Sequence, residues 1–168
     1  MSVPSPGLDG PRMPALLQER VAGFAVLTLN RPERRNSLSE AMLAGFSECL
    51  AAIAKDRTVR AVVIAANGSV FCSGHDLREL TTHRSDADGG RAYFCEIMAR
   101  CSAMMQALVA LPQPTIAAVQ GTATAAGCQL VASCDLAVAS ATARFCTPGV
   151  DIGLFWHLYF YLGILYPD

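Results

Sequence analysis

The sequence predicts an α/β fold with a mainly parallel sheet flanked by helices, and three observations carry this prediction. Short apolar runs alternate with segments of helical periodicity along the chain. The segment VRAVVIAA at 59–66 contains a continuous apolar run after Arg60, which is typical of a strand buried on both faces of a sheet. Strands separated by helices form βαβ units, in which consecutive strands lie parallel.

The first half of the chain provides a strand and a helix. Residues 24–29, FAVLTL, are bounded by turn-forming residues and predict a strand. For the helix that follows, Ser37 with Glu40 has the pattern of a capping box, and Ser39 is the rival N-cap. The helix itself is predicted from apolar residues at helical spacing: Leu43, Phe46, Leu50 and Ile53.

The second half repeats the alternation. The polar stretch TTHRSDADGG at 81–90 predicts a mobile loop, and strands are predicted at 115–119 and 136–139, with 144–146 as a further strand. A helix is expected to begin at about residue 125. Between the loop and the next strand, a long helix is predicted from an apolar face: Tyr93, Phe94, Ile97, Met98, Cys101, Met104, Met105 and Leu108.

Composition limits the classes of function. The chain has 168 residues, 52% of them hydrophobic and 16% charged, which fits one domain with a substantial core. The net charge of −1 provides no electrostatic footprint for nucleic acid or an anionic membrane. We expect a disordered lead at 1–15, a folded core at 16–155 and a hydrophobic tail at 156–168, whose apolar run is too short to span a bilayer.

The cysteines predict neither a disulfide framework nor a metal centre. There are seven of them, an odd number, without a C-x-x-C pair, so reduced and buried thiols are expected. Cys72 and His75 have the spacing of half a metal site, but the sequence shows no second half. The chain also lacks G-x-S-x-G, G-x-G-x-x-G and P-loop motifs, which disfavours a serine hydrolase or a nucleotide enzyme.

Two loops with unusual sequences follow predicted strands. FCSGHD at 71–76 contains a glycine that permits a sharp turn, and GTATAAG at 121–127 consists of small residues. Ligands in parallel sheets bind outside the carboxyl ends of the strands. The N–H groups of His75 and Ala126 would form an oxyanion hole if both faced one oxygen. The alternative interpretation is that these small residues only allow tight packing of a helix on the sheet.

Four consecutive segments resemble the crotonase superfamily, also called the enoyl-CoA hydratase/isomerase family. They are LTLNRPERRNSLSEAM, FCSGHDLREL, GTATAAGCQLVASCDLAVAS and FCTPGVDIGL, and they occur in family order between residues 16 and 155. The resemblance implies a ClpP-like spiral of ββα units and assembly into homotrimers or hexamers. It also implies a CoA thioester as the ligand, without any other cofactor or metal.

The resemblance also assigns candidate site residues. The backbone N–H groups of His75 and Ala126 correspond to the two oxyanion donors of the family. Arg78 is expected near a phosphate of CoA. The residues expected to contact the substrate are Ser73, His75, Asp76, Leu77, Arg78 and Ala126.

The sequence departs from family hydratases at both catalytic carboxylates. Gln129 and Gly149 stand where those enzymes have glutamate. Hydration needs one group to activate water and another to protonate carbon. Gln129 can hold a water molecule or satisfy a buried neighbour, but its amide does not take up a proton. The nearest other carboxylate in the sequence is that of Asp151.

Three hypotheses follow. The first is an acyl-CoA-binding protein of lipid metabolism that lacks hydratase activity, and the second is an active hydratase, isomerase or decarboxylase of the family. The third is a non-functional truncated isoform, because family chains continue beyond the point where this sequence reads WHLYFYLGILYPD. The resemblance implies a mitochondrial location, with the cytoplasm as the alternative, because the first residues are a poor transit peptide.

Overall fold

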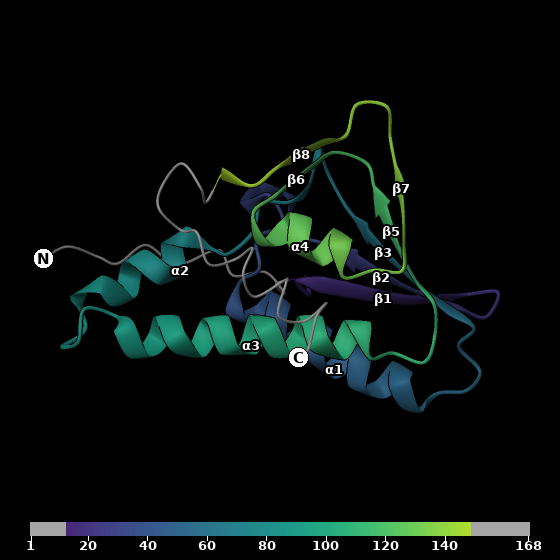
Figure 1. Ribbon diagram of the computed structural model, residues 1–168, viewed down its shortest axis with the longest axis horizontal. Helices are drawn as coiled ribbons and strands as arrows, with labels where there is room; N and C mark the ends of the chain where they lie inside the picture. The colour runs from purple at the N-terminus through teal and green to yellow at the C-terminus, as the bar shows by residue number, and fades with distance from the viewer. Residues whose placement is uncertain (1–12, 149–168) are drawn as a thin grey trace, which may run out of the picture.

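The computed structural model describes residues 13–148, which form two sheets with helices packed against them (Figure 1). The larger sheet has the strand order β1-β2-β3-β5-β7, and the smaller has the order β4-β6-β8. The strands are β1 Leu16–Val21, β2 Phe24–Leu29, β3 Ala61–Ala66, β4 Val70–Cys72, β5 Thr115–Val119, β6 Thr122–Thr124, β7 Leu136–Ala139 and β8 Arg144–Cys146. The helices are η1 Pro32–Arg34, α1 Glu40–Lys55, α2 Leu77–Thr82, η2 His83–Ser85, α3 Arg91–Val109 and α4 Ala126–Ala132.

The predicted parallel sheet is confirmed. β2, β3, β5 and β7 are parallel to one another, as are β4, β6 and β8. Only β1 runs antiparallel among the strands of residues 13–148, in a hairpin that pairs Val21 with Phe24. β2 alternates buried and half-exposed positions after Phe24, whereas β3 buries Ala61, Val62 and Ile64 and leaves its other three residues half-exposed. Buried side chains of both strands form the core with α1 and α3.

Two helices that pack together cover the core, α1 and α3 (Figure 1). Ser39 is the N-cap of α1 and accepts a hydrogen bond from Met42 N at 3.3 Å, so the rival N-cap is correct and the capping box at Ser37 is wrong. The predicted apolar face of α1 is buried, and so is most of that of α3. The buried residues of α3 are Ile97, Cys101, Met104, Met105 and Leu108.

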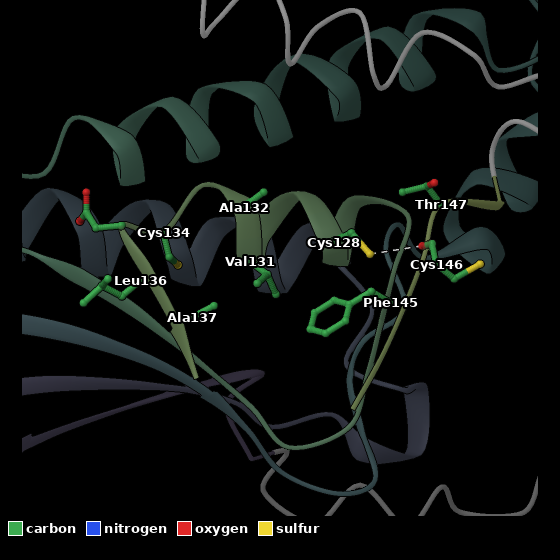
Figure 2. Close-up of a pocket in the computed structure, with 10 residues that line it drawn as sticks. Cys128, Val131, Ala132, Cys134, Leu136, Ala137, Phe145, Cys146 and Thr147 are labelled. Atoms are coloured by element: carbon green, nitrogen blue, oxygen red, sulfur yellow. Dashed lines mark hydrogen bonds between the residues drawn. The ribbon is translucent and has the colours of Figure 1, made fainter. Parts of the chain in front are cut away.

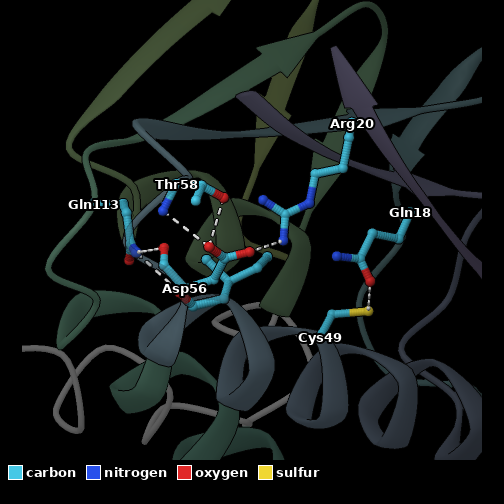
Figure 3. Close-up of polar contacts among 7 residues, drawn as sticks. Gln18, Arg20, Cys49, Asp56, Thr58 and Gln113 are labelled. Carbon is cyan, nitrogen blue, oxygen red and sulfur yellow. Dashed lines mark hydrogen bonds and ion pairs between the residues drawn. The ribbon is translucent and has the colours of Figure 1, made fainter. Parts of the chain in front are cut away.

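The end of α1 is fixed by polar contacts to distant segments (Figure 3). Gln113 donates from Nε2 to the carbonyl oxygens of Ile53 at 2.9 Å and Asp56 at 3.1 Å. The Asp56 carboxylate accepts from Thr58 and from Arg20 of β1 at 2.8 Å. These contacts join α1, β1 and the approach to β5, so the register of the sheet is tied to the helix.

The polar stretch at 81–90 is more ordered than predicted. Thr81 and Thr82 complete α2, and His83–Ser85 form the single turn η2. The His83 imidazole stacks on the Tyr93 ring with 3.6 Å between centroids and pairs with Asp86 at 2.8 Å. Contacts of the His83 side chain with residues three and ten positions later therefore order a segment whose composition alone predicts a loop.

β7 leaves an apolar surface at the end of the larger sheet. All four of its residues are exposed, including Leu136 at 61% and Val138 at 67%. Phe145 of β8 is 53% exposed. The predicted hydrophobic tail at 156–168 lies outside the described residues. No helix within residues 13–148 is long and apolar enough to cross a membrane.

Candidate functional site

The two unusual loops lie side by side because the strands that carry them are paired. β4 and β6 run parallel, with Cys72 opposite Ala123. The chain leaves β4 into residues 73–76 and leaves β6 into the start of α4. Both loops therefore emerge at the carboxyl edge of the smaller sheet, each one short strand later than the predicted strands at 59–66 and 115–119 that they were expected to follow.

Gly74 is the point of contact between the loops. Its φ of +84° lies in the left-handed region, which glycine adopts without steric cost. A Cβ at this position would lie 3.0 Å from Ala125 Cβ and 3.2 Å from Ala126 N. Covalent geometry then places the amide nitrogens of His75 and Ala126 within about 7 Å of each other. Two N–H donors that share one oxygen lie about 6 Å apart or less. This upper bound is compatible with donation by both amides to one oxygen, and the oxyanion hole stays a prediction.

The turn before α4 leaves the amide of Ala126, a fully buried residue, outside the hydrogen bonds of the helix. Ala125 has φ +52° and ψ −125°, a conformation that costs a non-glycine residue about 1–3 kcal/mol. Its N–H donates to Cys146 O at 2.9 Å, and its carbonyl accepts from the N–H groups of Cys128 and Gln129. Within residues 13–148 the Ala126 N–H has no acceptor. α4 has only seven residues, so the donor acts as an individual amide more than through a helix dipole.

The small residues of the second loop serve packing at two positions. A Cβ on Gly121 would lie 2.0 Å from Ser69 O, and one on Gly127 would lie 2.2 Å from Cys72 O. The backbone that comes close at these two glycines is therefore the chain's own β4 and the residue before it. The interpretation as tight helix–sheet packing is correct for Gly127 of α4, whereas Gly121 lies between two strands and packs against the residue before β4.

The other candidate residues occupy distinct positions. Gln129 is buried and lies one helical turn after Ala126, on the same face of α4. Ser73 donates its N–H to Arg35 O at 3.1 Å, and Leu77 is 70% exposed. Arg78 is exposed at the start of α2. Gly149 and Asp151 lie outside the described residues.

The structure adds residues that sequence reasoning did not assign to the site. The Asp76 carboxylate accepts from Ser37 Oγ at 2.8 Å and from Arg78 N at 3.0 Å, which caps α2. Asn36 is fully buried and holds the turn before Ser37. Asn36 and Ser37 both belong to the segment RPERRNSLSE, which follows the strand at 24–29, and the capping-box pattern of Ser37 with Glu40 indicates a helix start, not a contact with Asp76.

Comparison with known proteins decides the family. The enoyl-CoA hydratase/isomerase sequence profile matches residues 19–163. The chain belongs to this family. It is 45% identical over 142 residues to the mitochondrial enoyl-CoA hydratase domain-containing protein 3 of Xenopus laevis, covering 84% of this chain and 47% of that protein. It is 46% identical over 133 residues to the human protein of that name, covering 79% and 42%.

Solved structures of the family share the fold. An enoyl-CoA hydratase of Mycobacterium smegmatis is 52% identical with a TM-score of 0.76, covering 83% of this chain and 53% of that one. The human enoyl-CoA hydratase domain-containing protein 3 is 44% identical with a TM-score of 0.76, covering 84% and 54%. The predicted crotonase fold is confirmed. The chain spans about half the length of the curated relatives that it matches.

A hollow of about 590 Å³ lies beside the candidate site in this crotonase-family chain (Figure 2). It opens between α4, β7 and β8, and neither His75 nor Ala126 lines it. Cys128 lies at its edge with Sγ 3.2 Å from Cys146 O. The hollow is therefore part of the apolar surface left by β7, and the paired amides remain the candidate centre of chemistry.

The thiols do not assemble a reactive or metal-binding cluster. Cys72 is fully buried, and burial raises its pKa to about 12. In the described part of the chain, no three side chains of His, Cys, Asp or Glu are grouped so that they could hold a metal ion. Cys72 ends β4 and His75 follows it, and all seven cysteines are free thiols.

Proposed function

We propose that the chain is an acyl-CoA-binding protein on a crotonase scaffold that lacks hydratase activity. The observation that carries the proposal is the contact of Gly74 with Ala125 and Ala126, which brings the backbone amides of His75 and Ala126 together. An acyl-CoA presents a thioester carbonyl, whose oxygen gains negative charge when the thioester becomes an enolate. Each donor aimed at such an oxygen contributes roughly 3–4 kcal/mol of stabilisation.

The missing carboxylates support binding without hydration. Gln129 lies one turn after Ala126, where family hydratases have a glutamate, and the second such position is Gly149. A carboxylate can take a proton from water, whereas an amide cannot. General acid and base groups each contribute about 10²–10⁴-fold to a rate. With both replaced, the amide pair would polarise a thioester without the proton transfers that hydration requires.

The cellular setting is part of the same proposal. Relatives at 45% and 46% identity carry the word mitochondrial in their names, which supports a mitochondrial location. Acyl-CoA esters are intermediates of lipid metabolism, so that is the metabolism we assign. Assembly into trimers or hexamers, with the neighbouring Ser73, Asp76, Leu77 and Arg78 contacting the CoA, belongs to the proposal as well.

Calorimetry with two ligands tests the binding. Acetoacetyl-CoA ionises to an enolate, whereas free CoA has no thioester oxygen. Replacing the Ala126 N–H by an ester oxygen through semisynthesis removes the donor and adds no atoms, whereas proline would place a Cδ where the second loop packs against Gly74. The ester should weaken acetoacetyl-CoA binding about 100-fold and leave CoA binding unchanged. Equal losses for both ligands would show that the amide points elsewhere.

A turnover assay tests the missing chemistry. Crotonyl-CoA loses its conjugated absorbance on hydration, and we expect no loss with the unmodified protein. Gln129→Glu alone should have little effect, because carbon still lacks its proton donor, whereas Gln129→Glu with Gly149→Glu should give measurable hydration. Robust turnover by the unmodified chain would instead support the second hypothesis, an active family enzyme.

A further inference from the structure

The segment 35–40 and the segment 73–79 are joined by hydrogen bonds that surround His75, and together we call them the clasp. Ser73 N donates to Arg35 O at 3.1 Å, and Leu38 N donates to Gly74 O at 2.8 Å. Leu38 and His75 form an isolated parallel bridge. Two side-chain bonds complete the clasp: Ser37 Oγ to Asp76 Oδ2 at 2.8 Å and Glu40 N to Glu79 Oε2 at 2.9 Å.

The segment 35–40 is itself rigidly held. Asn36 is fully buried in the left-handed region at φ +51°, where asparagine is tolerated better than most residues. Its Nδ2 donates to Asn67 O and Val70 O, both at 2.8 Å, and its Oδ1 accepts from Arg31 N at 2.8 Å. The turn that presents Ser37 is thereby anchored to the end of β3 and the start of β4.

Asp76 has both of its oxygens committed to the protein. Oδ2 accepts from Ser37, and Oδ1 accepts from the N–H of Arg78. Burial alone would raise the pKa of this carboxyl, but the hydrogen bonds and the charge of Arg34 hold the pKa below its usual value. The carboxylate is therefore charged at neutral pH, and hydrogen bonds to a charged acceptor are about twice as strong as neutral ones.

We propose that Ser37 and Asp76 are positioning residues that fix the His75 amide opposite the Ala126 amide. The contact of Gly74 with Ala125 and Ala126 fixes the inner side of the loop, and the clasp fixes its outer side. Ser37 does not need to contact the ligand for this role, and the proposed contact of Asp76 with the CoA moiety is common to CoA and acetoacetyl-CoA. Oxyanion donors are effective because their orientation is set before the ligand arrives, so a loosened loop loses that advantage.

This inference rests on the proposed function, and the experiment therefore has one arm with ligand and one without. The variants of the full chain are Ser37→Ala, Asp76→Asn and, as a rescue, Ser37→Thr. Asn is a good N-cap with one carbonyl oxygen, so Asp76→Asn keeps the cap of α2. It replaces the charge-assisted bond from Ser37 by a neutral one, which the Asn Nδ2 donates to Ser37 Oγ. Ser47→Ala is the matched control, because Ser47 Oγ donates to Leu43 O within α1, away from the clasp.

In the arm without ligand, amide hydrogen exchange is measured at Leu38 and at residues 75–79. Ser37→Ala and Asp76→Asn should speed exchange at these amides by about 10-fold, as expected for the loss of one charge-assisted hydrogen bond. Ser37→Thr and Ser47→Ala should exchange like the unmodified chain. Unchanged exchange in Ser37→Ala and in Asp76→Asn would overturn the clasp, whatever the ligand results.

In the arm with ligand, the readout is the ratio of the dissociation constants of CoA and acetoacetyl-CoA. A general loss of stability weakens both ligands alike, whereas a displaced His75 amide weakens acetoacetyl-CoA alone. We expect the ratio to fall about 10-fold in Ser37→Ala and to recover in Ser37→Thr. A faster-exchanging loop with an unchanged ratio would overturn the positioning role. A ratio of one in the unmodified chain would overturn the proposed function and leave the exchange arm to decide on the clasp.

Discussion

The contact between Gly127 and β4 provides a sharp test of how the loops are brought together. A methyl group on Gly127 would lie 2.2 Å from Cys72 O, 2.8 Å from Cys72 C and 2.9 Å from Cys72 Cβ. Two of these three atoms belong to the backbone, so no side-chain rotation can relieve the overlap. The matched control is Gly45, which is also helical and whose methyl group would meet only Leu16 side-chain atoms, the nearest at 3.3 Å.

Both substitutions gain the same stabilisation from helix propensity, and they differ in the free-energy cost of packing the added methyl group. Gly→Ala inside a helix is worth about 1 kcal/mol in helix propensity at both positions. At Gly127 the helix and the strand must separate by roughly 1 Å, and overpacking of this kind costs about 1–3 kcal/mol, or more against backbone. Because the overlap at Gly127 is with backbone, we expect a cost of about 3–4 kcal/mol there, which after the gain of about 1 kcal/mol leaves Gly127→Ala destabilised by about 2–3 kcal/mol. Gly45→Ala should stay within about 1 kcal/mol of the unmodified chain.

Thermal unfolding followed by circular dichroism measures both variants. For a chain of this length, 1 kcal/mol shifts the melting temperature by about 2–4 °C, so Gly127→Ala should melt about 4–12 °C lower. It should also lose the preference for acetoacetyl-CoA over CoA, because α4 moves away from Gly74. A Gly127→Ala chain that melts with the Gly45→Ala chain would refute the packing account of the second loop.

Three further predictions concern other parts of the fold. Val138→Lys places a charge on the exposed surface of β7 and should reduce self-association in sedimentation velocity; a monomeric unmodified chain would contradict this. Iodoacetamide at mildly alkaline pH should label the exposed Cys95 and Cys146 in the native protein and spare Cys72, whose pKa is raised by burial; early labelling of Cys72 would show that β4 opens. The N–H and the hydroxyl of Thr115 hold the pKa of Asp135 below its usual value, so the stabilisation from these hydrogen bonds should be present above a pH of about 4 and be lost as the pH falls through the lowered pKa of the folded chain. Thr115→Val keeps the N–H bond and removes the hydroxyl, so it should reduce this pH dependence in part; an unchanged acid unfolding profile would rule out the contribution of the hydroxyl.

The sequence predicts the elements whose side chains repeat over several turns or along a buried strand. β2, β3, β5 and β7 have apolar runs, and α1 and α3 have apolar faces, so their periodicity is sufficient. β1, LLQERV, escapes prediction because it is a hairpin strand with mostly exposed side chains. β4 and β6 have three residues each, which is too short for a period to be read, although they carry both site loops.

The site is predictable where a local backbone feature defines it and obscure where distant residues meet. Gly74 and the start of α4 can be located because glycine and small residues signal unusual backbone. The choice between Ser37 and Ser39 as N-cap cannot be made locally, because Ser37 is taken by Asp76, 39 residues away. The demand for glycine at 121 and 127 likewise comes from Ser69 and Cys72, which no local window contains.

Amide chemical shifts of His75 and Ala126 test the central claim most directly. In the ¹⁵N-labelled chain, acetoacetyl-CoA should shift these two N–H resonances strongly downfield, because both donate to the same enolate oxygen, while free CoA should leave them close to their unliganded positions. If acetoacetyl-CoA shifted neither resonance, or if free CoA produced the same shifts, the account would be contradicted.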